Sequence, residues 1–280
     1  MKQITPKTTR DKIVLVTGAS SGIGEATAIA LQREGYIVYA GARRIERMEH
    51  LKPLGIRPVK LDVTDDASMR SVVQKIKKEC STIDILINNA GYGLYGAIED
   101  IPMKEAYRQL EVNLFGLARM TQLVLPLMRK QHSGKIINIA SIGGKITTPF
   151  GGWYHASKFA VEGFSDSLRN EVKHCGIDVV IIEPGGVKTE GISIAMNHLR
   201  RHTSSPSYIE LAQKTHKLYT GTINSKLDPS AVGNRIANIV STNKPKSRYT
   251  IGHLRIIVFA RRFMSDRMYD RLMMSMLKNS

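Results

Sequence analysis

Cysteine is scarce in this sequence. Only Cys80 and Cys175 occur among the 280 residues, and they do not form a CxxC pattern. This excludes a disulfide-stapled scaffold and a cysteine-based zinc site, and we predict no other metal site. So few cysteines are typical of a reducing compartment, and we therefore expect a cytoplasmic protein.

The sequence also lacks long apolar runs. No stretch approaches the roughly 20 apolar residues that a membrane-spanning helix needs. The N-terminal segment MKQITPKTTRDK is polar and has none of the apolar core of a signal peptide. With 42% hydrophobic and 23% charged residues, the composition is that of an ordinary globular protein.

Acidic residues are few relative to basic ones: 24 Asp and Glu stand against 41 Lys and Arg, and the formal net charge is +17. Such an excess suits an anionic small molecule, an anionic membrane surface or nucleic acid. Much of it lies in a basic, Met-rich C-terminal extension of about residues 248–280, whose composition fits an amphipathic helix. We favour packing of this extension on its own domain or on a neighbouring subunit, with membrane-surface contact as the alternative. No nucleic-acid partner is predicted, because the sequence has neither a recognised motif nor interleaved basic and aromatic residues.

Short apolar runs alternate with helical patterns along most of the chain. We predict strands at residues 13–16, 37–40, 59–61, 83–87, 135–140 and 179–183. We predict helices at residues 25–34, 67–80, 103–130 and 154–174, the third of them bent near Pro126. This alternation predicts an α/β fold, a single doubly wound Rossmann-type parallel sheet with helices on both faces. Residues 1–280 are expected to form one domain, from which a polar stretch of about residues 191–228 leaves the sheet.

A glycine-rich turn, TGASSGIG, spans Thr17–Gly24 between the first predicted strand and the first predicted helix. Gly18 permits a tight turn, Gly22 lets the backbone approach a pyrophosphate, and Gly24 lets the helix pack closely on the sheet. Backbone N–H groups at the helix N-terminus would attract the phosphates. Glycine spacing alone is equally compatible with a turn that binds nothing. The flanking strand and helix favour a dinucleotide site formed by Gly18, Ser20, Ser21, Gly22, Ile23 and Gly24.

The end of the second predicted strand bears on the choice between NAD and NADP. It carries Arg43 and Arg44 and no acidic residue. Guanidinium groups bind a 2′-phosphate through paired charged hydrogen bonds, whereas an acidic side chain would repel it. We therefore predict NADP(H) rather than NAD(H), with Arg43 as the main contact. The alternative is that both arginines are solvated surface charges.

Tyr154 and Lys158 are four residues apart on a predicted helix and therefore lie on one face. A free tyrosine has a pKa of about 10 and is a poor acid or base at neutral pH, but a neighbouring ammonium lowers that pKa. The pair would supply a tuned proton donor for carbonyl reduction. Ser141 follows a predicted strand at the same sheet edge, where its hydroxyl would bond the substrate oxygen and the tyrosine oxygen.

These motifs occur in one order along the chain: TGxxxGxG, NNAG at Asn88–Gly91, EVNLFG around Asn113, Ser141, the YxxxK pair, and EPGGVKT at Glu183–Thr189. In this combination the chain resembles the short-chain dehydrogenase/reductase family, strongly over roughly residues 11–190 and more loosely beyond. The resemblance implies a nicotinamide dinucleotide across the carboxyl edge of the sheet. It implies catalysis by Asn113, Ser141, Tyr154 and Lys158.

The resemblance also implies further contacts. Asp62 and Val63 match positions beside the adenine ring, although Asp62 would equally suit a helix cap. Asn113 would hold a water that links Lys158 to solvent. The substrate lid would fall in residues of about 191–228, which include Met196 and His198. The remaining cofactor contacts implied are Asn89, Ala90, Gly91, Tyr154, Lys158, Pro184, Gly185, Val187 and Thr189.

Other residues near these motifs have two interpretations each. Tyr95, Phe150 and Trp153 fall in loops at the carboxyl edge, where they either line an apolar substrate pocket or simply pack their loops. His155 points about 100° away from Tyr154 on a helix. No nucleophile-elbow pattern accompanies it, so a packing role is favoured over catalysis.

We predict an oxidoreductase that transfers a hydride between NADP(H) and a carbonyl or alcohol substrate. A hydrophobic ketone, aldehyde or secondary alcohol is favoured, steroid-like and retinoid-like compounds included. The alternatives are a catalytically silent NADP(H)-binding regulator and a membrane-surface-associated reductase that acts on lipid-like substrates. The chain is expected to form a homodimer or homotetramer.

Overall fold

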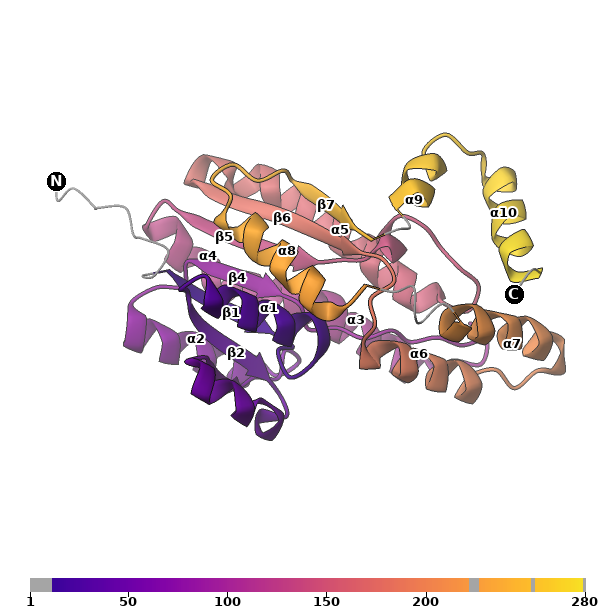
Figure 1. Cartoon of the computed structure of the whole chain (residues 1–280), viewed down its shortest axis with the longest axis horizontal. Coiled ribbons are helices and arrows are strands. Elements are labelled where there is room, and N and C mark those ends of the chain that lie inside the picture. Colours follow the sequence, from indigo (N-terminus) through magenta and orange to yellow (C-terminus); the bar gives the residue numbers. More distant parts are fainter. Residues whose placement is uncertain (1–11, 222–226, 253–254, 279–280) are drawn as a thin grey trace.

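The computed structural model describes residues 12–221, 227–252 and 255–278. At its centre is a seven-stranded parallel sheet with the order β3-β2-β1-β4-β5-β6-β7 (Figure 1). The order reverses between β1 and β4, which is where ligands bind in open α/β sheets. The strands are β1 (Ile13–Thr17), β2 (Ile37–Ala42), β3 (Arg57–Lys60), β4 (Ile85–Asn88), β5 (Gly134–Ile139), β6 (Ile177–Pro184) and β7 (Arg248–Ile251).

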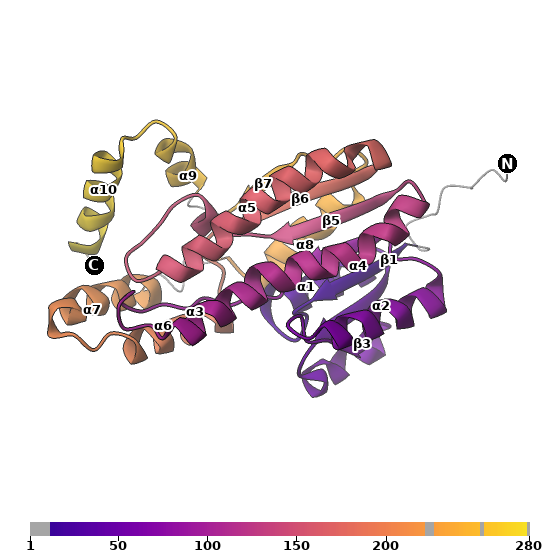
Figure 2. The same cartoon turned by 180° about the vertical axis from the view of Figure 1, so that it is seen from behind.

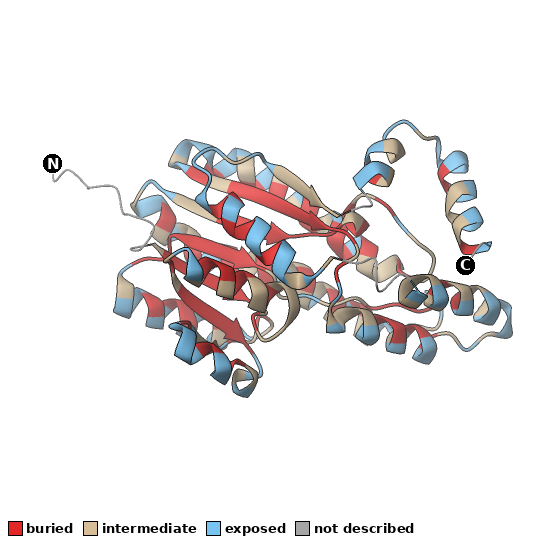
Figure 3. Ribbon diagram, in the orientation of Figure 1, coloured by how far each residue is buried: buried red, intermediate tan, exposed pale blue. Residues whose placement is uncertain are grey.

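Two helical layers cover the sheet, because alternate side chains of each strand point to opposite faces. In β1, Val14 and Val16 pack toward one layer, whereas Ile13 and Leu15 pack toward the other. Figure 3 shows the resulting buried sheet between partly exposed helices. The first layer contains α1 (Gly22–Arg33), α8 (Pro229–Ser241) and a 3₁₀ segment (Ile45–Leu54); the second, seen in Figure 2, contains α2 (Asp66–Cys80), α4 (Gly116–Lys130) and α5 (Gly152–Val172). The predicted fold class is confirmed.

The helix predicted over residues 103–130 is interrupted in the structure. It consists of α3 (Met103–Leu110), a π-helical turn (Glu111–Phe115) and α4. The predicted bend near Pro126 is therefore misplaced, since Pro126 lies inside α4 and the irregular turn comes earlier. The turn contains the buried Asn113, whose side chain bonds both backbone groups of Tyr92. π-Helical turns are frequent at functional sites because they redirect a side chain out of the regular helical series.

The polar stretch of residues 191–228 is more regular than its composition predicts. It forms α6 (Glu190–Arg201) and α7 (Pro206–Gly221), and residues 222–226 of it lie outside the described residues. Most exposed positions carry polar side chains, with Ile194 and Ile209 as exceptions, while Met196 and Leu199 are buried on the inner side of α6. Figures 1 and 2 place both helices beyond the carboxyl ends of the strands.

The C-terminal extension is not a single amphipathic helix. Its first residues form β7, the last strand of the sheet, and α9 (Arg255–Arg261) and α10 (Asp266–Lys278) follow. Arg248 opens this strand and its guanidinium bonds the buried Glu162, so the basic residue is part of the sheet edge. Among the helices of the described segments, none is long and apolar enough to cross a membrane.

Candidate active site

The glycine-rich turn has the backbone that a phosphate cradle needs. Gly18 and Gly22 have φ angles of +67° and +60°, which disfavour a side chain. A Cβ on Gly24 would lie 2.4 Å from the carbonyl oxygen of Gly18. Ser21 precedes α1 in an extended conformation, and its side chain caps no N–H group of the helix. The first N–H groups of α1 are therefore left to an external acceptor, and the turn fits the pyrophosphate of a dinucleotide.

The close packing at Gly24 gives a stability prediction. We expect Gly24→Ala to lower the free energy of unfolding by about 1 to 3 kcal/mol, because the new methyl group meets backbone that cannot move aside. The matched control is Gly163→Ala in α5, where nothing lies within 4 Å of the added Cβ. That control should be neutral or stabilising by up to about 1 kcal/mol. Chemical denaturation of both variants measures the difference, and equal stabilities would contradict the packing argument.

Thr17 connects the glycine turn to the NNAG segment, and the sequence analysis did not identify it as a site residue. Its buried hydroxyl accepts hydrogen bonds from the backbone N–H groups of Asn89 and Ala90, both at 3.0 Å. The Asn89 amide donates in return to the carbonyl oxygens of Thr17, at 2.9 Å, and Gly18, at 3.1 Å. These bonds fix the ends of β1 and β4 to each other at the point where the strand order reverses. The position of Thr17, directly before Gly18, was the available signal.

Arg43 and Arg44 are exposed at the end of β2, as the NADP(H) prediction requires. Arg43 lines a cavity of about 430 Å³ together with Lys60, Asp62, Asp65, Ser68 and Ser71. Burial raises the pKa of Asp62, but hydrogen bonds from Thr64 and the charge of Arg43 outweigh it, so the net pKa is lowered. The cavity thus combines two carboxylates with cationic and hydroxyl groups.

The helix-cap alternative for Asp62 is wrong. The residue that caps α2 is Asp65, whose carboxylate accepts from the N–H of Ala67 at 3.0 Å. Asp62 instead accepts from the backbone N–H and the hydroxyl of Thr64, at 2.9 and 2.7 Å. These bonds turn the chain directly after β3. Val63, the next residue, is buried, and its backbone oxygen lies 2.4 Å from where a Cβ on Gly116 would stand.

Tyr154 lies at the start of α5, near the carboxyl ends of β4 and β5. Burial raises the pKa of its phenol to about 12, while a hydrogen bond with Ser141 acts in the lowering direction. The Ser141 hydroxyl also accepts from the N–H of Gly143 at 3.0 Å and lies 3.4 Å from the carbonyl oxygen of Pro184. Ser141 thus has a fixed orientation beside the phenol, and without a bound cofactor the tyrosine is protonated.

Lys158 is buried one turn further along α5. Its ammonium donates to the carbonyl oxygen of Ile139 at 2.8 Å. Burial lowers the pKa of Lys158 to about 8, although the charge of Glu162 acts in the opposite direction. A Cβ on Gly91 would lie 3.7 Å from the lysine nitrogen and 3.1 Å from the side-chain oxygen of Asn113. The NNAG segment, Lys158 and Asn113 therefore meet at one place.

Asn113 reaches this place from the π-helical turn. Its side-chain oxygen accepts from the N–H of Tyr92 at 3.1 Å, and its amide donates to the carbonyl oxygen of Tyr92 at 3.0 Å and to the hydroxyl of Ser157 at 2.9 Å. Asn113 is 1% exposed, so its orientation is fully determined by these bonds. The sequence analysis did not identify Ser157, which joins α5 to this network.

The segment after β6 completes the site. Pro184 is the last residue of β6, and the N–H of Gly185 donates to the carbonyl oxygen of Ile251 at 2.9 Å. Val187 pairs with Leu227 in an isolated bridge. The Gly185 bond holds this segment against the end of β7, and the Val187 pairing holds it against the residues before α8.

Thr189 and Glu190 bring this segment across to the glycine turn. A Cβ on Gly22 would lie 3.2 Å from the Thr189 methyl group. Glu190 begins α6 and forms a two-pronged ion pair with Arg47, with distances of 2.6 and 3.1 Å. Arg47 follows β2. The start of α6 therefore contacts both the phosphate turn and the segment after β2.

Apolar and aromatic side chains surround Tyr154. Tyr95, Met196 and Leu199 form a buried cluster with Phe150 and Tyr154 packed against it. The Tyr95 and Tyr154 ring centroids are 5.7 Å apart. Tyr219 of α7 joins this cluster and contacts the hydroxyls of Tyr95 and Thr148 at 3.3 and 3.1 Å. Trp153 packs in a neighbouring cluster with Leu94 and Ile101.

His155 supports the loop between Ser141 and Tyr154. The N–H of Thr148 donates to Nε2 at 3.0 Å, so the ring proton is on Nδ1, which lies 2.9 Å from the carbonyl oxygen of Gly143. Burial lowers the pKa of His155, which keeps this tautomer neutral. The structure places His155 in a packing role, as the sequence analysis favoured.

His198 and His202 tie α6 to the body of the protein. His202 Nε2 lies 3.0 Å from a carboxylate oxygen of Glu105 in α3, and His198 Nδ1 lies 3.7 Å from the same oxygen. The two imidazole rings are stacked with centroids 5.8 Å apart. Of the two lid residues named from the sequence, Met196 faces the apolar cluster and His198 faces Glu105.

A dinucleotide cradle beside a serine-bonded tyrosine and a buried lysine suits hydride exchange between a nicotinamide and a carbonyl or alcohol group. The molecule is therefore an oxidoreductase. Residues 12–197 match the family model of the short chain dehydrogenases. The chain belongs to this family.

Several known proteins resemble the whole chain. It is 38% identical to a 3-ketodihydrosphingosine reductase of Bacteroides thetaiotaomicron over 250 residues, which cover 89% of this chain and 91% of that protein. It is 31% identical to an NADPH-dependent 3-dehydrocapnine reductase of Ornithobacterium rhinotracheale, over 95% of this chain and 98% of that one. A crystal structure of a short-chain dehydrogenase from Streptomyces avermitilis superposes with a TM-score of 0.79 at 31% identity, over 92% and 93% of the two chains.

Proposed function

We propose that this protein is an NADPH-dependent reductase of a ketone carried on a long apolar, lipid-like molecule. The observation that carries the proposal is the position of Tyr154: its phenol is bonded to Ser141 and stands in a cluster of aromatic and aliphatic side chains that includes residues of α6 and α7. An apolar wall beside a proton donor suits a hydrophobic ketone. Two relatives are named for reduction of such compounds, 3-ketodihydrosphingosine and 3-dehydrocapnine.

The cofactor would be held by three groups of residues. The turn from Gly18 to Gly24 and the N-terminus of α1 would bind the pyrophosphate, because their N–H groups point out of the helix. Arg43, with Arg44 beside it, would bind the 2′-phosphate of NADP(H). Further contacts would come from Ser20, Ser21 and Ile23 in the turn, from Asp62 and Val63 toward the adenine, and from Asn89, Ala90, Gly91, Pro184, Gly185, Val187 and Thr189 toward the ribose and nicotinamide. When bound, the nicotinamide supplies the hydride.

The proton comes from the chain. Ser141 donates a hydrogen bond to the substrate carbonyl oxygen, which orients the carbonyl toward Tyr154 and stabilises negative charge on that oxygen. Tyr154 then gives its phenolic proton to the same oxygen and completes the alcohol. Lys158 stabilises the phenolate that remains and binds a ribose hydroxyl. Asn113 holds a water through which Lys158 is connected to solvent, so the tyrosine is reprotonated after each turnover.

The low pKa of Lys158 predicts a pH dependence. The charged lysine is the form that stabilises the phenolate and binds the ribose, and in the cofactor-free protein it loses its proton as the pH rises through about 8. We therefore expect kcat/KM for NADPH to fall above about pH 8. Lys158→Arg keeps its positive charge at higher pH, so its kcat/KM should begin to fall at a higher pH than that of the wild-type protein, although its overall rate is lower. Steady-state kinetics across the range measure both, and a profile that Lys158→Arg leaves unshifted would assign the fall to another group.

The substrate class is tested with a series of 3-ketones of increasing chain length, assayed by NADPH absorbance. We expect kcat/KM to rise with chain length, by about three- to fourfold for each methylene that enters the apolar cluster. Tyr219→Ser, which removes an aromatic ring from the α7 side of this cluster, should flatten the rise. A short, polar ketone reduced as efficiently as the long ones would contradict the proposal.

We further propose that the chain acts as one domain. Helices α6 and α7 form a lid whose movement admits substrate, and the Arg47–Glu190 and His202–Glu105 contacts hold the lid closed. The homodimer or homotetramer stays a prediction.

A further inference from the structure

The C-terminal helices α9 and α10 are fixed to the loop that leads from Ser141 to Tyr154. Val258 of α9 and Tyr269 of α10 are buried with Ile146 in one cluster. The Tyr269 hydroxyl donates to the carbonyl oxygen of Thr147 at 2.6 Å and accepts from its N–H at 3.0 Å. The two helices therefore have a defined position beside the substrate side of the molecule, as Figure 1 shows.

The outer side of α9 carries large apolar side chains in solvent. Ile256, Phe259 and Phe263 are 73%, 62% and 75% exposed. Ile256 and Phe259 are three residues apart on α9 and therefore share one side of that helix, and Phe263 follows in the turn after Arg261. The rings of Phe259 and Phe263 contact each other with centroids 5.3 Å apart. We call Arg255, Ile256, Phe259, Arg262 and Phe263 the α9 face.

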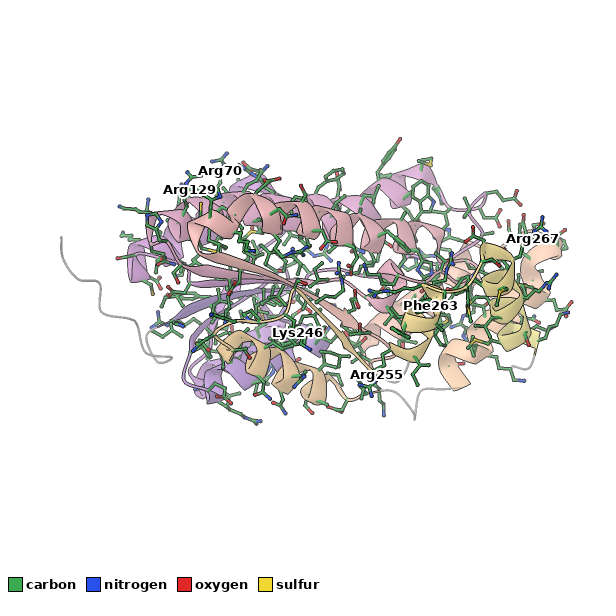
Figure 4. All side chains as sticks on the ribbon, turned by 90° about the horizontal axis from the view of Figure 1, so that it is seen from above. Arg70, Arg129, Lys246, Arg255, Phe263 and Arg267 are labelled. Atoms are coloured by element: carbon green, nitrogen blue, oxygen red, sulfur yellow. The ribbon has the colours of Figure 1, made fainter. Side chains whose placement is uncertain are left out.

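The same region is strongly cationic. From Lys244 to the C-terminus the sequence has nine Lys and Arg residues and two acidic ones, Asp266 and Asp270. Arg248 and Arg261 are paired with acidic side chains. Within the described parts of the chain, Lys246, Arg255 and Arg262 make no ion pair and all three border a cavity of about 580 Å³ next to Phe259. Figure 4 shows Arg255, Phe263 and Arg267 at the end of the molecule that carries α9 and α10, Lys246 nearer the middle, and Arg70 and Arg129 at the opposite end.

The combination of apolar and cationic groups on the α9 face fits some classes of partner better than others. A second copy of the chain, docked symmetrically, would bring two faces of the same positive charge together. Nucleic acid would satisfy the charges, but an aliphatic and two phenylalanine side chains would gain little from a phosphate backbone. An anionic bilayer meets both requirements, since phosphates pair with the arginines while the phenylalanines enter the acyl boundary.

We propose that the α9 face docks the protein on an anionic lipid bilayer. Ile256, Phe259 and Phe263 insert below the headgroups, and Arg255, Arg262 and Lys246 bind lipid phosphates. Because α9 and α10 rest on the Thr147 loop, docking places the substrate side of the protein toward the membrane surface. A lipid-like ketone would then pass from the bilayer to the site. The docking does not depend on the proposed reductase activity.

Vesicle co-sedimentation of the full chain tests the proposal without cofactor or substrate. Wild-type protein is mixed with vesicles of pure phosphatidylcholine, and with equimolar phosphatidylglycerol and phosphatidylcholine. One variant, Phe259→Ser with Phe263→Ser, removes the apolar part of the face, and another, Arg255→Glu with Arg262→Glu, reverses its charge. The matched control, Arg129→Glu with Lys130→Glu, makes the same charge change at the exposed end of α4. Near-ultraviolet circular dichroism confirms that each variant is folded.

We expect wild-type protein and the α4 control to bind the anionic vesicles and to ignore pure phosphatidylcholine. Each α9-face variant should bind about tenfold or more weakly, and added salt should weaken wild-type binding. Equal binding by the α4 control and the arginine variant would leave only non-specific attraction and would overturn the proposal. So would absence of wild-type binding, or a wild-type dimer that the phenylalanine variant converts to monomer. None of these results bears on NADPH oxidation by the same samples, so failure of docking and failure of the reductase function are separable.

Discussion

Tyr154→Phe should lower kcat for ketone reduction by about a hundredfold to ten-thousandfold, the range that general acid catalysis contributes. The variant keeps the aromatic ring and its contacts with the apolar cluster but loses the phenolic proton that Tyr154 transfers to the carbonyl oxygen. With a pKa of about 12 in the cofactor-free protein, the wild-type phenol is protonated at neutral pH and ready to act as an acid. Affinity for NADPH should change little, since Tyr154 contributes one contact among many. Steady-state reduction kinetics and NADPH fluorescence titration measure the two effects separately.

Ser141→Ala and His155→Phe are informative companions to Tyr154→Phe. Ser141→Ala removes the hydrogen bond that orients the phenol and the carbonyl, and we expect an intermediate loss of kcat. His155→Phe keeps an aromatic ring but frees the Thr148 backbone, so it should affect thermal stability more than chemistry. If Tyr154→Phe retained wild-type turnover, the proton would have to come from another group, and the mechanism would fail.

Arg43→Gln should weaken the preference of the enzyme for NADPH over NADH. We expect kcat/KM for NADPH to fall by roughly tenfold to a hundredfold, which is the loss of a charged hydrogen bond to the 2′-phosphate. The value for NADH should stay within about twofold, because its ribose carries no such phosphate. Arg43 is suited to this role by its exposed position at the end of β2, on the wall of a cavity that Asp62 also lines.

A matched control distinguishes specific recognition from general loss of positive charge. Arg33→Gln removes an exposed arginine at the far end of α1, away from the glycine turn. It should leave both cofactors unaffected, whereas Arg44→Gln should weaken NADPH less than Arg43→Gln does. If Arg43→Gln reduced the efficiencies of NADPH and NADH equally, Arg43 would not bind the extra phosphate.

The sequence predicted β1 to β6 because most of these strands contain short apolar runs, whereas β7, whose residues are RYTI and all half-buried, was not predicted. Residues 13–16 and 37–40 lie within β1 and β2 for this reason. Motif spacing also located the residues that meet at the sheet edge: Asn113 and Lys158 are 45 positions apart in the chain, yet both border Gly91. Spacing worked here because the carboxyl ends of parallel strands share one edge.

The features that the sequence did not predict depend on contacts between segments that are distant in the chain. The π-helical turn at Glu111–Phe115 leaves no mark on a helical pattern, because its cause is the bonding of Asn113 to Tyr92. Thr17 binds the NNAG segment through its hydroxyl, and a single hydrogen bond of this kind produces no recurring pattern in the sequence. The polar composition of residues 191–228 predicts a departure from the sheet but not helices α6 and α7, because the buried side that Met196 and Leu199 form depends on contacts with the rest of the protein.

The sequence alone also leaves the role of the C-terminal arginines open. Their excess suits packing on the same domain, contact with a partner subunit or contact with a membrane. Arg248 proved to belong to the sheet edge, where Glu162, Asp166 and Glu183 neutralise it. Arg255 and Arg262 instead border exposed phenylalanines, and only three-dimensional placement separates these two kinds of arginine.

In the proposed reaction Tyr154 protonates a substrate ketone while a hydride arrives from NADPH. The most direct test of this reaction is a single turnover with NADPH that carries deuterium at the transferred position of the nicotinamide and with a long-chain 3-ketone. We expect an alcohol with deuterium on the carbinol carbon, formed in amounts equal to the enzyme, and formed about a hundredfold or more slowly by Tyr154→Phe that has bound the same NADPH. Alcohol without deuterium, or equal single-turnover rates for the two proteins, would contradict this mechanism.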